Sequence, residues 1–252
     1  MKNKQTQHLE IINLPSACYN PSHEQRLLTP MKKWYFISPL ILQKLIWIPT
    51  NIILRFFGRL EIRGMENLKG LDSPVIFACN HTSELDPFFV PASLPFFSSF
   101  SPIFYTSRES KFYVNSGWRK HFYGGTFFKA WGSYPVHVGL HDYEKSLAHH
   151  LELIRHGGSL CIFPEGRTTH DGNIQPAKGG VAYLAYTTGA VIVPVRIGGV
   201  FRFSAKDLFM RRCHLSITYG KPMRFPSGLN IEPALDDFKT YANEIMGEVG
   251  KL

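Results

Sequence analysis

The sequence has little that would build a metal site or a disulfide framework. Its four cysteines, Cys18, Cys79, Cys161 and Cys213, lie far apart and form no Cys-x-x-Cys pair or His-rich ligand set. This spacing excludes a zinc finger and favours reduced thiols in a cytosol-facing protein. An RNP-type aromatic motif and a Gly-rich RNA loop are also missing. We therefore expect no nucleic-acid partner, although the formal net charge is +9.

Internal repeats and low-complexity tracts are missing too, and we expect no secretory signal. Acidic residues are the scarcer charge, with 19 Asp and Glu against 28 Lys and Arg. Apolar residues make up 44% of the 252 positions, which is typical of a globular chain. This length permits one domain with a sizeable core, or one domain with an appendage.

The N-terminal region divides into two parts. Residues 1–30 are polar and proline-containing, and we expect a loosely ordered lead-in. Residues 31–58 hold the most apolar stretch, whose prolines, Pro39 and Pro49, predict a pair of membrane-associating helices rather than one. The surplus of Lys and Arg around it suits an anionic lipid surface. Helices lying in the interface, one membrane span and a helical hairpin buried on the domain all remain open.

Residues 59–252 alternate between strand and helix patterns. This predicts an α/β domain with a mixed, largely parallel sheet flanked by helices. Pro194 lies within a predicted strand and indicates an edge strand, a bulge or a strand end. Strands are predicted at 60–64, 74–79, 103–106, 133–138, 159–163, 190–197 and 215–219, and the longer helices at 142–156, 178–188 and 232–249.

The first candidate site follows the apolar strand at 74–79. His81 comes just past the strand end, and Asp86 follows five residues later, before Pro87 and a predicted helix start. One turn of chain can therefore return the carboxylate to the imidazole, fix its tautomer and leave the other ring nitrogen free to take a proton. The alternative is an ordinary turn in which Asp86 caps the helix and His81 is solvated. The spacing alone leaves both open.

A second candidate site follows the strand at 159–163. Glu165, Gly166 and Arg167 come directly after Pro164, at the strand end where ligands bind in α/β sheets. Gly166 permits a tight turn, and Arg167 offers a planar fork for a phosphate. Lys178 precedes two glycines at a predicted helix start, which is a weaker anion-binding signal. A plain polar turn is the alternative for this segment.

Together these segments resemble the glycerolipid acyltransferase family, of the 1-acyl-sn-glycerol-3-phosphate (lysophosphatidic acid) acyltransferase type. Its His-x4-Asp block matches His81 to Asp86, and its Phe-Pro-Glu-Gly block matches Phe163 to Gly166. A fourth, proline-centred apolar block matches residues 192–195. The resemblance covers roughly residues 60–220. It departs at the second block, where Val138 takes the usual arginine position, so the acceptor head group stays open.

The resemblance implies an enzyme that transfers a fatty acyl chain from acyl-CoA or acyl carrier protein to a lipid hydroxyl, in phospholipid biosynthesis. The implied acceptor is 1-acyl-sn-glycerol-3-phosphate; the alternatives are another lysophospholipid or aminolipid, or a lipid-binding protein without turnover. No metal or cofactor is expected, and the implied location is membrane-associated, on the cytoplasmic face of a bacterial inner membrane. The implied catalytic residues are His81 and Asp86, and the implied substrate-binding residues are Glu165, Gly166, Arg167, Thr168, Arg108, Lys111 and Lys178.

Overall fold

The computed structural model of the chain describes residues 34–109, 126–137, 142–226 and 233–252. Its centre is a seven-stranded sheet in the order β1-β7-β6-β2-β5-β3-β4. Neighbouring strands run parallel except β6 and β7, which are antiparallel. The predicted mixed, largely parallel sheet is therefore confirmed. The strands are β1 (Glu61–Arg63), β2 (Val75–Cys79), β3 (Ile103–Ser107), β4 (Ser133–Pro135), β5 (Ser159–Ile162), β6 (Val191–Gly198) and β7 (Ser216–Tyr219).

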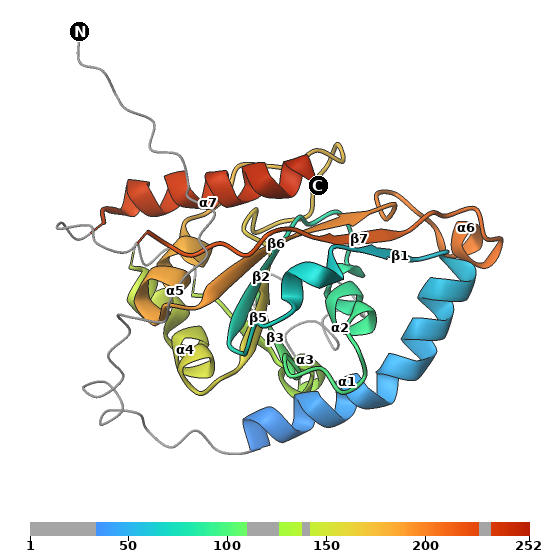
Figure 1. Ribbon diagram of the computed structural model, residues 1–252, viewed down its shortest axis with the longest axis horizontal. Coiled ribbons are helices and arrows are strands. Elements are labelled where there is room, and N and C mark those ends of the chain that lie inside the picture. The colour runs from blue at the N-terminus through green and yellow to red at the C-terminus, as the bar shows by residue number, and fades with distance from the viewer. Residues whose placement is uncertain (1–33, 110–125, 138–141, 227–232) are drawn as a thin grey trace, which may run out of the picture.

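Helices cover both faces of this sheet (Figure 1). One face is packed mainly by α4 (Tyr143–Arg155), α5 (Gly180–Thr188) and α7 (Leu235–Lys251). The other carries α1 (Trp34–Ile52) and α2 (Phe89–Ser93), with α3 (Thr126–Trp131) packed against α1. Shorter elements are the π-helix η1 (Ile53–Phe57), the 3-10 helices η2 (Met65–Leu68) and η3 (Asp86–Phe88), and α6 (Ala205–Phe209).

The central position of β2 in the sheet explains why its sequence is apolar throughout rather than alternating. Val75, Phe77 and Cys79 point into the core on the α2 side, whereas Ile76 and Ala78 point into the core below α4, α5 and α7. All five side chains are buried. A strand covered on both faces requires this pattern, and it carries the chain directly to His81.

The expectation of an edge strand or strand end at Pro194 is wrong, whereas the expected bulge is present beside it, because the antiparallel pairing shifts by one residue between Val195↔Tyr219 and Ile192↔Met223. β6 lies in the middle of the sheet between β7 and β2, and Pro194 pairs in register with Ala78 of β2. The Pro194 carbonyl accepts a hydrogen bond from the Gly220 N–H, on the side away from β2. A residue's N–H and C=O point to the same side of a strand, so the missing N–H faces the end of β7, and no ladder bond to β2 is lost.

The apolar N-terminal stretch forms one helix instead of the predicted pair. α1 contains both Pro39 and Pro49 and runs directly into η1. Packing on the domain offsets the backbone hydrogen bonds that the prolines remove. The Gln43 side chain donates to the Ile103 carbonyl at 2.6 Å and accepts from the Ile103 N–H at 2.9 Å, and the Trp47 indole donates to the Leu94 carbonyl.

Other differences concern boundaries. The strand expected at 133–138 ends at Pro135, and the helix expected from Lys178 begins at Gly180. The predicted helix at 142–156 is confirmed as α4: the Asp142 carboxylate accepts from the Lys145 N–H at its start, and Gly157 adopts a left-handed φ of 84° just past its end. The short helix α6 had not been predicted.

Candidate active site

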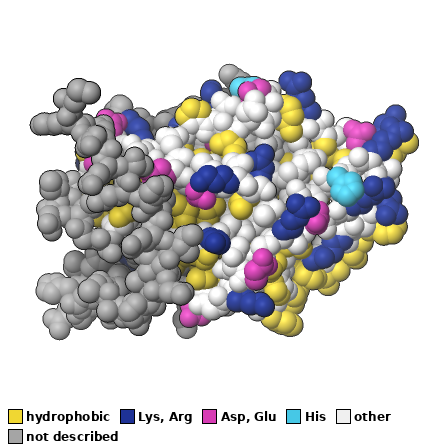
Figure 2. All heavy atoms as spheres, turned by 45° about the horizontal axis from the view of Figure 1, so that its top comes forward, with side chains coloured by type: hydrophobic (Ala, Val, Ile, Leu, Met, Phe, Trp, Pro, Cys, Tyr) yellow, Lys and Arg dark blue, Asp and Glu magenta, His cyan; other side chains and the backbone are white. Residues whose placement is uncertain are grey.

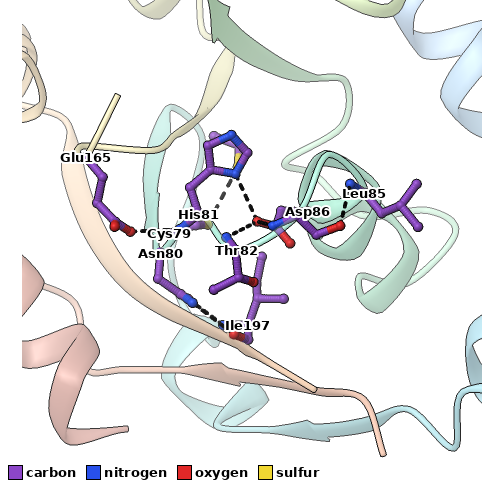
Figure 3. A network of polar contacts seen from close by, with 10 residues as sticks. Cys79, Asn80, His81, Thr82, Leu85, Asp86, Glu165 and Ile197 are labelled. Carbon is purple, nitrogen blue, oxygen red and sulfur yellow. Dashed lines mark hydrogen bonds and ion pairs between the residues drawn. The ribbon is translucent and has the colours of Figure 1, made fainter. Parts of the chain in front are cut away.

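His81 lies on the loop after β2, Asp86 is the first residue of η3, and their side chains meet (Figure 3). Asp86 Oδ2 lies 2.9 Å from His81 Nδ1 and accepts the backbone N–H groups of Thr82 at 2.6 Å and Ser83 at 2.9 Å. An ionised carboxylate only accepts, so Nδ1 carries the ring proton and Nε2 keeps its lone pair. The Asp86 side chain is fully buried, whereas His81 keeps 19% of its side chain exposed. The pairing expected from the five-residue spacing is present, and His81 is not merely solvated.

Two further residues, which the sequence had not singled out as functional, hold His81 in place. The Asn80 side-chain amide donates to the Ile197 carbonyl at 2.9 Å and accepts from the Ile197 N–H at 2.7 Å, which ties the loop to β6. The Phe163 ring stacks on the imidazole, with ring centroids 4.2 Å apart. Their positions directly before His81 and directly before Pro164 are the signals that could have identified them.

Glu165 joins the two motif segments. Its Oε1 accepts the His81 backbone N–H at 2.8 Å, and its Oε2 accepts the Gln175 N–H at 2.9 Å. The residue is only 4% exposed. Burial raises the pKa of Glu165, and the two N–H groups oppose that rise. The Thr169 N–H, which donates to the His81 carbonyl at 2.8 Å, makes a second bridge between the same loops.

Gly166 makes the tight turn after Glu165. Its φ is +70°, and its N–H donates to the Phe163 carbonyl at 2.9 Å. A Cβ at this position would meet the Lys178 side chain at 3.0 Å, so the lysine crosses directly over the turn. Arg108 reaches the same turn from the end of β3, because its Nη2 donates to the Gly166 carbonyl at 3.0 Å.

A pocket of 270 Å³ opens where these side chains converge. Three cations, Arg108, Arg167 and Lys178, surround it, and Glu165 is the acidic residue of the lining. An anionic group fits this charge balance. The structure thus brings together five of the predicted substrate-binding residues, including Gly166. Thr168 is not part of the lining, and Lys111 and Val138 lie outside the described residues. The lining is completed by Gln175 and Pro176, which the sequence analysis had missed.

Two buried thiols lie beneath the site. Cys79, on β2, and Cys161, on β5, are free cysteines whose sulfurs lie 3.6 Å apart. Burial raises the pKa of the Cys79 thiol, and the hydrogen bond with Cys161 adds to the rise. The Cys79 thiol therefore stays neutral, and both side chains pack in the core, where neither can reach a substrate above the strand ends.

Comparison with known proteins identifies the family. The family profile described as Acyltransferase matches residues 59–198, which is more than half of the chain. The chain belongs to the acyltransferase family. This acyltransferase carries the His81–Asp86 loop and the Glu165 loop inside the matched region. The resemblance drawn from the motifs is therefore confirmed at the level of the family.

This acyltransferase is 28% identical over 151 residues to the chloroplastic 1-acyl-sn-glycerol-3-phosphate acyltransferase BAT2 of Brassica napus, an alignment covering 60% of this chain and 40% of the relative. It is 26% identical over 183 residues to a 1-acyl-sn-glycerol-3-phosphate acyltransferase of Chlamydomonas reinhardtii, with 71% and 51% covered. The chain thus spans about half or less of the length of these relatives.

Among solved structures, the fold is similar to the crystal structure of the 1-acyl-sn-glycerophosphate acyltransferase PlsC from Thermotoga maritima. The TM-score is 0.55 at 18% sequence identity, and the match covers 83% of this chain and 81% of that chain. At this identity the similarity establishes only the fold of this acyltransferase, not its substrate.

Proposed function

We propose that this acyltransferase moves a fatty acyl chain from a CoA or acyl-carrier-protein thioester to the free hydroxyl of 1-acyl-sn-glycerol-3-phosphate, giving phosphatidic acid. The observation that carries the proposal is the His81–Asp86 pair, whose bond at Nδ1 leaves Nε2 free. Glu165 links this pair to a pocket bordered by three cations. A base beside an anion-binding pocket suits an acceptor that has both a hydroxyl and a phosphate.

In the proposed reaction, His81 Nε2 takes the proton of the acceptor hydroxyl while its oxygen attacks the thioester carbonyl. Asp86 stabilises the resulting imidazolium through Nδ1. The tetrahedral intermediate then collapses: the new C–O ester bond remains, the C–S bond breaks, and the imidazolium returns its proton to the leaving thiolate. Atoms and charge balance without a covalent enzyme intermediate, because the acceptor itself is the nucleophile.

The acceptor's phosphate is proposed to bind between Arg108, Arg167 and Lys178. Arg108 already donates to the Gly166 carbonyl, which directs its guanidinium toward the pocket. Glu165 is proposed to act by holding the loops rather than by touching the acceptor, because both its oxygens already accept backbone N–H groups. Val138 at the family's usual arginine position favours the second candidate, in which the acceptor is another lysophospholipid or an aminolipid.

We further propose that the protein works on a membrane surface, at its cytoplasmic face, with residues 31–58 as the membrane-associating segment and 59–252 as the catalytic domain. Tyr35–Phe57 is long and apolar enough to cross a membrane by length and composition. Its bonds to the domain through Gln43 and Trp47 support lying in the interface instead. Its opposite face exposes Ile37, Ile41, Leu45, Ile48 and Ile52.

The test uses purified full-length protein, labelled acyl-CoA or acyl carrier protein, and a panel of acceptors in vesicles. We expect transfer to 1-acyl-sn-glycerol-3-phosphate. Asp86→Asn should reduce turnover on the order of 1000-fold, since a neutral amide cannot stabilise the imidazolium. His81→Ala should remove the base, while His156→Ala, at the C-cap of α4, is the histidine control. Preference for a phosphate-diester or amine-bearing acceptor would favour the second candidate, and normal turnover by both folded site variants would reject the dyad.

A further inference from the structure

The short helix α6 and the turn after it carry an exposed apolar tip that the proposed reaction does not use. Phe209 is 58% exposed and Met210 is 51% exposed. Phe209 packs on Phe57 of η1 with ring centroids 5.2 Å apart, and the Arg211 guanidinium lies 4.7 Å from the Phe56 ring centre. The tip therefore continues the exposed apolar surface of Ile52, Ile53 and Phe56, and α6 lies beside the C-terminal end of α1 (Figure 1).

The topology puts this tip on the same edge of the sheet as His81. β6 and β2 are parallel neighbours, so both strands end at that edge. His81 follows the end of β2, and the chain leading to α6 follows the end of β6 at Gly198. A membrane that contacts α6 would therefore also lie next to the sheet edge that holds His81.

Basic residues flank the tip in the chain. The segment 199–215 holds four Lys and Arg residues against one acidic residue, a net charge of +3. The carboxylate of the acidic residue, Asp207, accepts a hydrogen bond from the Ser204 hydroxyl at 2.5 Å. The cations are exposed: Arg202, Lys206, Arg211 and Arg212. In Figure 2, hydrophobic side chains form a band along one lower edge of the molecule, with Lys and Arg side chains beside it.

Backbone conformation gives an independent indication. Among the described residues, the non-glycine positions with positive φ are Arg59, Arg202 and Arg211, at 50°, 52° and 57°. All three border the η1–α6 surface in the chain: Arg59 follows η1, and the other two flank α6. Glycine adopts this conformation without steric cost, whereas arginine does not. Arg202 also serves the fold, because its Nη2 donates to the His170 carbonyl at 3.3 Å, so the indication of a further role for the side chain rests on Arg59 and Arg211, which are exposed.

We propose that the α6 tip is a second membrane contact beside α1, which binds anionic lipid; this rests on the membrane role proposed for α1. Phe209 and Met210 enter the outer part of the leaflet, and Lys206, Arg211 and Arg212 contact lipid phosphates. An apolar tip ringed by cations fits a lipid surface with negative charge. Its continuity with the apolar face of α1 favours a bilayer over an acidic protein as the occupant. When both α1 and the α6 tip contact the membrane, the sheet edge that holds His81 faces the leaflet that supplies the acceptor.

Two variants test the contact in full-length protein by co-sedimentation with vesicles of phosphatidylcholine, with and without phosphatidylglycerol. Arg211→Gly/Arg212→Gln should weaken binding to the anionic vesicles about 25-fold, from about five-fold per charge, and lower the salt dependence. Glycine suits φ of 57° at position 211, so thermal stability should not fall. Phe209→Ser/Met210→Ser should weaken binding to both vesicle types. The matched controls are Lys221→Gln/Lys251→Gln and Leu235→Ser, at exposed positions elsewhere on the chain.

A direct readout comes from Phe209→Trp, whose emission, measured as a difference from the wild type, should shift to the blue on vesicles and be quenched by brominated lipid. Acyl transfer in detergent should be unchanged in the tip variants, so the binding result does not depend on the proposed reaction. Wild-type affinity in both tip variants, or equal losses in the controls, would overturn the proposal. Retained vesicle binding with a selective loss of activity toward acyl-carrier-protein donors would instead identify a protein-docking surface.

Discussion

Replacing Glu165 by Gln separates a positioning role from an acceptor-binding role. The wild-type carboxylate accepts the His81 N–H at 2.8 Å and the Gln175 N–H at 2.9 Å, and the residue is 4% exposed. The amide has only one oxygen, so its NH₂ group must face one of these two donors. One buried N–H is then left without an acceptor, which costs about 1–3 kcal/mol. For a chain of this size, each kcal/mol lowers the melting temperature by about 2–4 °C.

The kinetic consequence follows from which bond is lost. If the His81 N–H loses its acceptor, the imidazole moves relative to the substrate, and a displacement of about 1 Å costs on the order of 100-fold in rate. We expect kcat to fall while KM for the acceptor stays within a factor of about two. Glu165→Asp should not restore the rate, because the shorter side chain cannot reach both donors.

The assay is steady-state acyl transfer with varied acceptor at saturating donor, alongside thermal unfolding of each variant. Glu244→Gln, an exposed carboxylate on α7, is the matched control. A rise of about ten-fold in the acceptor KM at unchanged kcat would refute the positioning argument, since this is the signature of lost binding alone. Unchanged stability and unchanged kinetics would show that the bridge between the two loops is dispensable.

Three further predictions concern the pocket, the core and α1. Arg167→Gln should raise the acceptor KM on the order of ten-fold for a phosphate-bearing acceptor and leave an uncharged acceptor unaffected, which competition between the two acceptors would measure. Burial lowers the pKa of His150 to about 4, so the unfolded state binds more protons than the folded state below about pH 6.5. The free energy of unfolding, measured with urea, should therefore fall by up to about 3 kcal/mol between pH 6.5 and 4. His150→Leu should abolish this loss. Ile41→Ser/Leu45→Ser/Ile48→Ser should weaken vesicle binding on the order of 100-fold, from about 3 kcal/mol of lost apolar contact, without the unfolding that deletion of the whole helix would cause.

The features predicted correctly from the sequence are local ones. β2 is a short apolar run covered on both faces, and the His81–Asp86 contact spans only five residues. α4 combines a capping aspartate, a helical period and a terminal glycine within sixteen residues, from Asp142 to Gly157. In each case the residues that determine the structure lie next to one another in the chain, so their spacing already contains the geometry.

The features that were missed depend on contacts distant in sequence. The Glu165 carboxylate reaches a backbone N–H 84 residues earlier, and Asn80 bonds to a residue 117 positions later. Pro194 suggested an edge strand because residues 191–198 do not reveal that the neighbouring strand β7 ends before it reaches Pro194. Pro39 and Pro49 suggested a helix break because the packing that keeps α1 continuous comes from α2 and β3.

These long-range contacts also explain how a small loop becomes a defined site. Asp86 fixes the ring of His81 through Nδ1, Asn80 fixes the loop to β6, and Glu165 fixes the His81 backbone to the turn beside the cationic pocket. Each bond acts on a different part of the loop, so together they fix the imidazole relative to the pocket. Because the Glu165 carboxylate bonds directly to the His81 backbone, its loss should disturb proton transfer before it disturbs phosphate binding.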